Sequence, residues 1–290
     1  MQLTLENLYH TYYPPKSQLL KWVGNKQKFA AEITRFFPTD FKRFFEPFLG
    51  SGAIIATVSP RNGLGSDTFL PLMEIWLTLK SNPQKLVTWY AERRNMIGQK
   101  TKEEVYEIIR SSYNEKPNGA DFLFLSRACY GGIVRFRKAD GYMSTPCGVH
   151  DPISVENFSK RVVEWKNRLK YVEFRHCDYK IAFAESQTGD LIYCDPPYSH
   201  SQSILYGAQD FKLSELLNEI AIAKYKGVKV ALSIDGHKKS GNLLCDLPIP
   251  DGLFEHEMYI DCGRSMLRRF QREGETLEDE QVSDRLLLTY

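Results

Sequence analysis

The sequence predicts an α/β fold built around an open sheet, because three apolar runs each end in polar or glycine-rich groups. Leu-Ile-Tyr-Cys at 191–194 is typical of a buried strand and runs into Asp195-Pro196-Pro197-Tyr198. Phe-Phe-Glu at 44–46 leads into a glycine turn at 50–52, and a short run from Leu64 ends at Asp67. Open α/β sheets bind ligands at the carboxyl ends of their strands, so we expect these ends to share one site.

Length and composition are those of an ordinary globular protein with one large domain, or one domain with a smaller insertion. The chain has 290 residues, 42% of them hydrophobic and 26% charged. It opens polar and has no apolar run of about 18 residues, so we expect no secretion signal, no membrane partner and a cytoplasmic location.

The six cysteines predict reduced thiols and no metal site. They stand at 129, 147, 177, 194, 245 and 262, without a C-x-x-C pair or a neighbouring His at metal spacing. Cys194 beside Asp195 is an alternative nucleophile, but no His follows at a useful place. A buried strand thiol is the favoured interpretation of Cys194.

The N-terminal part of the chain combines a polar arm with an aromatic and basic turn. Residues 1–16 form the arm, and Lys-Trp-Val-Gly-Asn-Lys at 21–26 precedes a helix expected over about 26–37. The helix start after Gly24 offers free backbone N–H groups to an anion, and Trp22 offers a stacking face. A hydrophobic anchor with surface lysines explains the same turn equally well.

The glycine turn at 50–52 lets a ligand approach the backbone closely. It matches neither G-x-x-x-x-G-K-[ST] nor G-x-G-x-x-G, so a triphosphate loop is disfavoured. Asp67 follows about 20 residues later, the position from which an acid binds ribose hydroxyls in dinucleotide sites. A plain turn residue is the alternative for Asp67.

The middle of the chain is helical and basic. Helices are expected over 72–80, about 84–112 and 121–127, and residues 81–170 hold 16 Lys and Arg against 10 Asp and Glu. Residues 133–143 alternate around Ala-Asp-Gly, which indicates a hairpin with Arg135 and Arg137 on one face. A basic β-ribbon fits a major groove and arginine suits guanine edges, although exposed hairpins also carry arginine for solubility.

The remaining segments complete the expected sheet. A helix is predicted over 155–169, a strand over 171–175 ending near Asp178, a helix over about 213–226 and a strand over 228–233. The tail, about 256–290, alternates in places and predicts a terminal hairpin that pairs with the sheet.

The strand that ends in Asp195 predicts a site for a planar group that carries an amine. The Asp195 side chain and the Pro196 carbonyl supply two hydrogen-bond acceptors, and Tyr198 supplies a flat ring for stacking. A strand that simply ends in a Pro-Pro turn is the alternative.

Three motifs in this order, Lys-Trp-Val-Gly-Asn-Lys, Phe-Glu-Pro-Phe-Leu-Gly-Ser-Gly and Asp-Pro-Pro-Tyr, make the chain resemble the Dam-type (alpha-group) DNA adenine-N6 methyltransferases over about 18–235. The resemblance implies a Rossmann-like domain dependent on S-adenosylmethionine (AdoMet), with a mixed seven-stranded sheet. It also implies an inserted, mainly helical target-recognition domain with a β-hairpin. The catalytic domain would span 1–71 and 166–290, and the recognition domain 72–165.

The resemblance also assigns roles to single residues. Those expected to bind AdoMet are Trp22, Lys26, Glu46, Pro47, Gly50, Gly52, Asp67 for the ribose, Asp178 for the adenine ring, and Asp195. The run Glu46 to Gly52 is expected to form the cofactor floor. Those expected to hold the target adenine are Asp195, Pro196 and Tyr198. Those expected to meet DNA are Arg135 at a guanine, Arg137, Lys138 and Tyr206, which lies with Phe211 in the loop after the catalytic motif. The base would be flipped out of the duplex to reach the methyl group.

The sequence departs from the family in its recognition half. Ser126-Arg127 and Gly131-Gly132 stand where Asn-Arg and Asn-Gly are usual, and Ser-Thr-Pro-Cys-Gly at 144–148 replaces Asn-x-Pro-x-Gly. These changes bear on the target sequence rather than on the chemistry. The alternatives are a cytosine-N4 methyltransferase, an RNA or protein methyltransferase, and a catalytically silent DNA-binding module. Expected partners are double-stranded DNA and a cognate restriction endonuclease, in a bacterial, archaeal or phage-encoded protein at the nucleoid.

Overall fold

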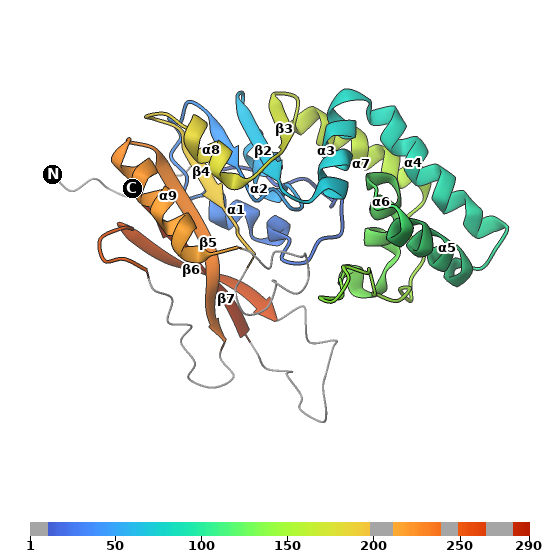
Figure 1. Cartoon of the computed structure of the whole chain (residues 1–290). Coiled ribbons are helices and arrows are strands. Elements are labelled where there is room, and N and C mark those ends of the chain that lie inside the picture. Colours follow the sequence, from blue (N-terminus) through green and yellow to red (C-terminus); the bar gives the residue numbers. More distant parts are fainter. Residues whose placement is uncertain (1–10, 198–210, 239–248, 265–280) are drawn as a thin grey trace.

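Seven strands form one mixed sheet in the order β3-β2-β1-β4-β5-β7-β6 (Figure 1). The computed structural model describes residues 11–197, 211–238, 249–264 and 281–290. The strands are β1 Phe44–Glu46, β2 Gly63–Asp67, β3 Val172–His176, β4 Leu191–Cys194, β5 Lys229–Lys238, β6 His256–Arg264 and β7 Gln281–Leu288. Strands β1 to β5 pair in parallel, and β7 is inserted antiparallel between β5 and β6. The expected mixed seven-stranded sheet and its terminal hairpin are confirmed.

The strand order changes direction between β1 and β4, where the two strands pair in register at Phe44 and Leu191. From β1 the chain builds outward through β2 to β3, and from β4 it builds through β5 to the other edge. Both strands are buried along their whole length, as parallel strands covered on both faces are. A crevice forms outside the carboxyl ends of strands at such a reversal, which places Glu46 and Asp195 there.

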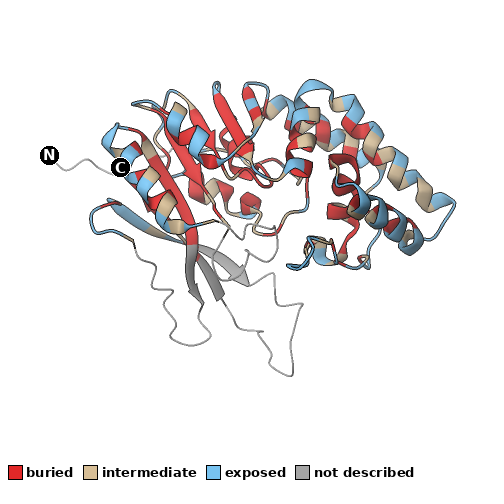
Figure 2. Ribbon diagram, viewed as in Figure 1, coloured by how far each residue is buried: buried red, intermediate tan, exposed pale blue. Residues whose placement is uncertain are grey.

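Helices cover the sheet and extend beyond one side of it as a helical lobe (Figure 1). The segments around the sheet are η2 Lys26–Lys28, α1 Ala30–Thr34, α2 Ala53–Val58, α3 Leu70–Ser81, α8 Tyr179–Glu185 and α9 Leu213–Tyr225. The lobe consists of α4 Pro83–Asn95, η3 Met96–Gly98, α5 Lys102–Glu115, α6 Gly119–Ala128, η4 Tyr130–Gly132 and α7 Val155–Arg168. Figure 2 shows buried residues concentrated in the strands and on the inner faces of these helices.

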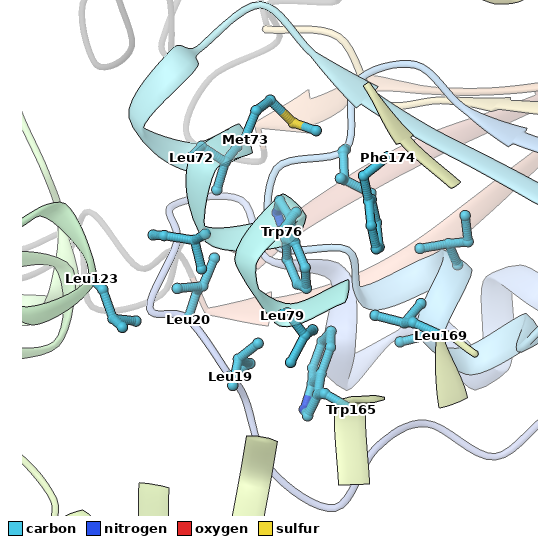
Figure 3. Close-up of a cluster of buried hydrophobic side chains, with 14 of the residues drawn as sticks. Leu19, Leu20, Leu72, Met73, Trp76, Leu79, Leu123, Trp165, Leu169 and Phe174 are labelled. Atoms are coloured by element: carbon cyan, nitrogen blue, oxygen red, sulfur yellow. The ribbon is translucent and has the colours of Figure 1, made fainter. Parts of the chain in front are cut away.

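Trp76 of α3 joins the helical lobe to the sheet. Its ring stacks on Phe174 of β3 with centroids 5.6 Å apart, and lies 5.7 Å from the ring of Trp165 of α7 (Figure 3). The indole N–H of Trp76 donates to the carbonyl of Gly50 at 3.1 Å. This one side chain therefore packs the lobe against the sheet and also fixes the glycine turn.

Two long helices expected from the sequence are broken in the structure. The helix expected over 26–37 is instead a 3₁₀ turn followed by the short α1. The stretch 84–112 divides into α4 and α5, because Thr101 starts a new helix with a capping box to Glu104.

The expected hairpin at 133–143 is reduced to a turn with one isolated antiparallel bridge, between Phe136 and Met143. The backbone N–H of Arg135 donates to the hydroxyl of Thr145 at 2.8 Å rather than to a ladder partner. Gly141 adopts a positive φ of 69° to close the turn.

Candidate active site

A cavity of about 610 Å³ opens at the carboxyl ends of β1, β2 and β4. It brings together eight of the nine residues expected to bind AdoMet: Trp22, Lys26, Glu46, Pro47, Gly50, Asp67, Asp178 and Asp195. Phe211, named with Tyr206 in the sequence, also lines it. Gly52 and Pro196 are not among its lining residues, and Tyr198 and Tyr206 lie outside the described residues. Its volume is in the range of sites for small ligands and cofactors.

The glycine turn passes so close to Trp22 that Gly50 has no room for a side chain. A Cβ at Gly50 would lie 2.8 Å from the indole nitrogen of Trp22, and Gly50 has a φ of 45°. Its backbone N–H donates to Asp67 Oδ2 at 3.1 Å, and the other oxygen of Asp67 accepts from Phe69 N–H at 3.0 Å. The ends of β1 and β2 are thus joined through Asp67.

Burial keeps two acids of the cavity in an unfavourable environment for charge. It raises the pKa of Glu46 well above its usual range, against the hydrogen bond that Glu46 accepts from Ile55 N–H at 2.6 Å. Repulsion from Asp195 and Asp67 adds to this rise. Burial also raises the pKa of Asp67, opposed by hydrogen bonds from Gly50 and Phe69. Through its hydrogen bond from Ile55 N–H, Glu46 caps the N-terminus of α2, because the N-cap residue Gly52 has no side chain to offer.

Lys26 lies between two carboxylates. Its Nζ is 3.0 Å from Asp195 Oδ1 and 3.1 Å from Asp284 Oδ2. Burial lowers the pKa of the ammonium, but the attraction of Asp195 and Asp284 outweighs burial and raises that pKa above its ordinary value. Lys26 is therefore a permanent cation that holds the carboxylate at the end of β4.

An aromatic group forms one wall of the cavity. The rings of Phe48 and Tyr179 stack with centroids 5.1 Å apart, and Phe211 meets Phe48 edge-on at 5.8 Å. Asp178 starts α8 next to these rings, and its Oδ1 accepts from Lys180 N–H at 2.9 Å. Flat apolar faces beside a carboxylate suit a heteroaromatic ring that carries an amine.

A family model matches most of the chain. The family model of D12 class N6 adenine-specific DNA methyltransferases matches residues 22–251, which include every described site residue named from the sequence. The chain belongs to this family. It is 27% identical to a DNA adenine methylase of Vibrio cholerae serotype O1 over 74% of this chain and 79% of that protein. It is 25% identical to the type II methyltransferase M.MjaIII of Methanocaldococcus jannaschii over 74% of this chain and 82% of that protein.

In this DNA methyltransferase the thiol of Cys194, next to the Asp-Pro-Pro-Tyr motif, is buried and unreactive. Cys194 is fully buried, and burial raises its pKa well above the ordinary value, with Asp195 and Glu46 adding to the rise. A protonated, inaccessible thiol is no nucleophile. Among the described residues no cluster of three or more His, Cys, Asp or Glu side chains could hold a metal ion.

The predicted DNA-contacting residues of the methyltransferase differ in their surroundings. Arg137 pairs with Asp140 at 2.7 Å and lies over the ring of Tyr142, so its guanidinium shapes the turn. Lys138 is exposed, and Arg135 is half-buried at the base of the turn. No helix in the described part of the chain is long and apolar enough to cross a membrane.

Arginines of the helical lobe hold the segment that leads into Trp22. Arg127 of α6 donates to the carbonyls of Gln18 and Leu19 at 3.3 and 2.7 Å, and Arg161 of α7 donates to Gln18 at 2.7 Å. Arg127 follows Ser126, one of the departures from the family pattern, and its role here is structural.

Sequence reasoning singled out neither the ring of Phe48 nor that of Tyr179, although Phe48 lies in the run Glu46 to Gly52 that was expected to form the cofactor floor. It also missed Asp284 as a partner of Lys26. The two rings could have been found from their positions beside Pro47 and Asp178. Asp284 carries no local signal, because the tail sequence predicts a hairpin on the sheet but not which of its residues comes to lie beside Lys26.

Proposed function

We propose that the protein transfers the methyl group of AdoMet to the exocyclic N6 amine of an adenine in double-stranded DNA. Family membership supports the class of reaction, and the presence of Asp195 in the lining of the acidic cavity carries the assignment to this site. Because β1 and β4 flank the reversal of the sheet, their ends would bring the cofactor floor and the amine acceptor to one place.

The residues of the cavity fit AdoMet. The lining acids Glu46, Asp67, Asp178 and Asp195 suit a ligand that carries a sulfonium, an ammonium, a ribose diol and an adenine amine. The carboxylate of Asp67 would accept from the ribose hydroxyls, and Gly50 would let the ligand lie against the backbone. The rings of Phe48 and Tyr179 would cover the adenine, with Asp178 as acceptor for its amine. AdoMet would supply an electrophilic methyl group, and the protein supplies its position.

Asp195 and the Pro196 carbonyl would accept the N–H protons of the target amine. The lone pair of an adenine amine is delocalised into the ring, so acceptors that favour a tetrahedral nitrogen and stabilise its developing positive charge lower the barrier. Alignment of the amine with the methyl group contributes the rest, and no covalent enzyme intermediate is needed. The family resemblance assigns stacking of a flipped-out base to Tyr198.

Residues 72–165 would form the target-recognition domain. Its basic excess suits the DNA backbone, with Lys138 at a phosphate and Arg135 at a guanine edge. Arg137 would act indirectly by holding the turn through Asp140. The expected cytoplasmic, DNA-associated location is part of this proposal, as is a cognate restriction endonuclease in the context suggested by the type II relative.

Two measurements test the proposal. Titration calorimetry should show AdoMet binding by the wild-type protein, and methyl-labelled AdoMet should transfer its label to duplex DNA. AdoMet binding without transfer to any DNA would favour a catalytically silent DNA-binding module. Absence of AdoMet binding would remove the cofactor assignment altogether.

A further inference from the structure

Asp284 is a buried acid on β7, between Ser283 and Arg285 and just before an apolar run. The run Leu286 to Leu288 starts two residues after Asp284, which is 6% exposed. Burying a carboxylate costs free energy, and replacing a buried ion pair by apolar residues is often neutral or stabilising. Stability alone therefore does not account for an acid at this position.

The contact of Asp284 lies at the centre of the catalytic arrangement. Its Oδ2 is 3.1 Å from Nζ of Lys26, and the same nitrogen is 3.0 Å from Oδ1 of Asp195. The Lys26 and Asp284 side chains are 7% and 9% exposed, so the pairs are poorly screened by water. One ammonium between two carboxylates leaves the cluster of three with a net negative charge.

We infer that Asp284 is a positioning residue, which holds the ammonium of Lys26 in place and through it orients the carboxylate of Asp195 toward the target amine. The inference rests on the proposed role of Asp195 as amine acceptor. Lysine has a flexible four-carbon stem, so an ammonium held by Asp195 alone would move with that carboxylate. A second carboxylate, on an antiparallel strand held between β5 and β6, gives Lys26 a defined position.

Asp284 also sets the charge at Asp195. Its negative charge offsets that of Lys26, so the ion pair does not cancel the charge that Asp195 presents to the reacting nitrogen. A carboxylate has about four lone-pair sites, so Asp195 can accept from Lys26 and from an amine at the same time. Loss of the Asp284 charge would direct the full positive charge of Lys26 toward a centre that itself becomes positive.

The first test compares Asp284→Asn with the wild type under single-turnover conditions, with saturating AdoMet and duplex DNA. Asparagine keeps the shape and removes the charge. We expect the methyl-transfer rate to fall about 10- to 100-fold. Groups that orient metal ligands in other proteins act through a neighbour in the same way, and their loss has an effect of this size. The AdoMet Kd should change by much less than tenfold, the change that corresponds to about 1.4 kcal/mol.

The matched control is Glu257→Gln on the neighbouring strand β6. Glu257 pairs with Arg285 of β7 at 2.8 Å on the exposed side of the same hairpin, so this variant also exchanges an acid for an amide. It should keep the wild-type rate and AdoMet affinity. Asp284→Glu, which restores the charge with a longer reach, should recover part of the rate lost in Asp284→Asn.

A double-mutant cycle tests whether Asp284 acts through Lys26. In the Lys26→Met background, Asp284→Asn should cause no further loss of rate. The same fractional loss in both backgrounds would overturn the inference, and so would a wild-type rate in Asp284→Asn. Should Lys26→Met fail to fold, the comparison of Asp284→Asn with Asp284→Glu decides, and equal losses in the two would overturn it. If Asp284→Asn and Asp195→Ala both keep the wild-type rate of methyl transfer, the proposed function fails. If Asp284→Asn keeps the wild-type rate and Asp195→Ala loses it, only this inference fails.

Discussion

The carboxylate of Asp67 accepts a hydrogen bond from the backbone N–H of Gly50 at 3.1 Å, so the proposed ribose-binding acid also fixes the proposed cofactor floor. The two groups come from the ends of neighbouring strands, β2 and β1. A second bond, from Phe69 N–H at 3.0 Å, fixes the other oxygen of Asp67. The site is therefore prepared for its ligand by contacts within the protein.

Asp67→Ala is expected to weaken AdoMet binding by about 1–3 kcal/mol, the typical loss when hydrogen bonds to a charged group are removed. Turnover at saturating AdoMet should suffer less, because Asp67 does not face the target amine. Asp67→Asn, which keeps one acceptor oxygen for Gly50, should show a smaller loss. Calorimetric titration of the three proteins measures this, and equal affinities would move the ribose contact elsewhere.

Gly50→Ala is expected to lower both stability and AdoMet affinity. Its Cβ would stand 2.8 Å from the indole nitrogen of Trp22, at a φ of 45° that L-residues rarely adopt. The thermal midpoint should fall by an amount that corresponds to about 1 kcal/mol or more. Gly98→Ala is the control, since a Cβ there meets nothing within 4 Å. If both variants melt and bind like the wild type, the close approach of the turn to Trp22 is unimportant.

Glu46→Gln is expected to be more stable than the wild-type protein at neutral pH, and about equally stable at acidic pH. Burial raises the pKa of Glu46 above its ordinary value near 4.5, so the folded state holds this proton more tightly than the unfolded state. Stability therefore falls as the pH rises above 4.5 toward the folded pKa, and glutamine removes that loss while it can still accept from Ile55 N–H. Thermal melts of both proteins should nearly coincide at about pH 4 and diverge in favour of Glu46→Gln at neutral pH. A constant difference at all pH values would contradict the titration of Glu46.

The sequence predicted which acids meet at the cavity better than it predicted the elements around them. Glu46, Asp67 and Asp195 could be placed because each follows an apolar run, and parallel strands bring such ends to one edge. The division of 84–112 into two helices was missed because Thr101 acts through a local capping box within an otherwise helical pattern. Asp284 could not be found, because its contact with Lys26 joins residues from the two ends of the chain.

Arg135→Ala is expected to relax specificity at one base position of the target, at a cost of about 1–3 kcal/mol there. Lys138→Ala should instead weaken binding to all sequences alike and lower the salt dependence, as loss of a phosphate contact does. Methylation of a randomised DNA library by each variant, followed by sequencing, separates the two roles. A uniform drop in rate with an unaltered motif for Arg135→Ala would make Arg135 a backbone contact.

The central claim is that Asp195 and its cavity methylate adenine N6, and nucleoside mass spectrometry of treated DNA tests it most directly. DNA incubated with the wild-type protein and methyl-labelled AdoMet should contain labelled N6-methyladenine. Asp195→Ala should bind AdoMet but form this product at least about 100-fold more slowly, the loss typical of one preorganised polar contact. Labelled N4-methylcytosine in place of N6-methyladenine, or near-normal turnover by Asp195→Ala, would contradict the account.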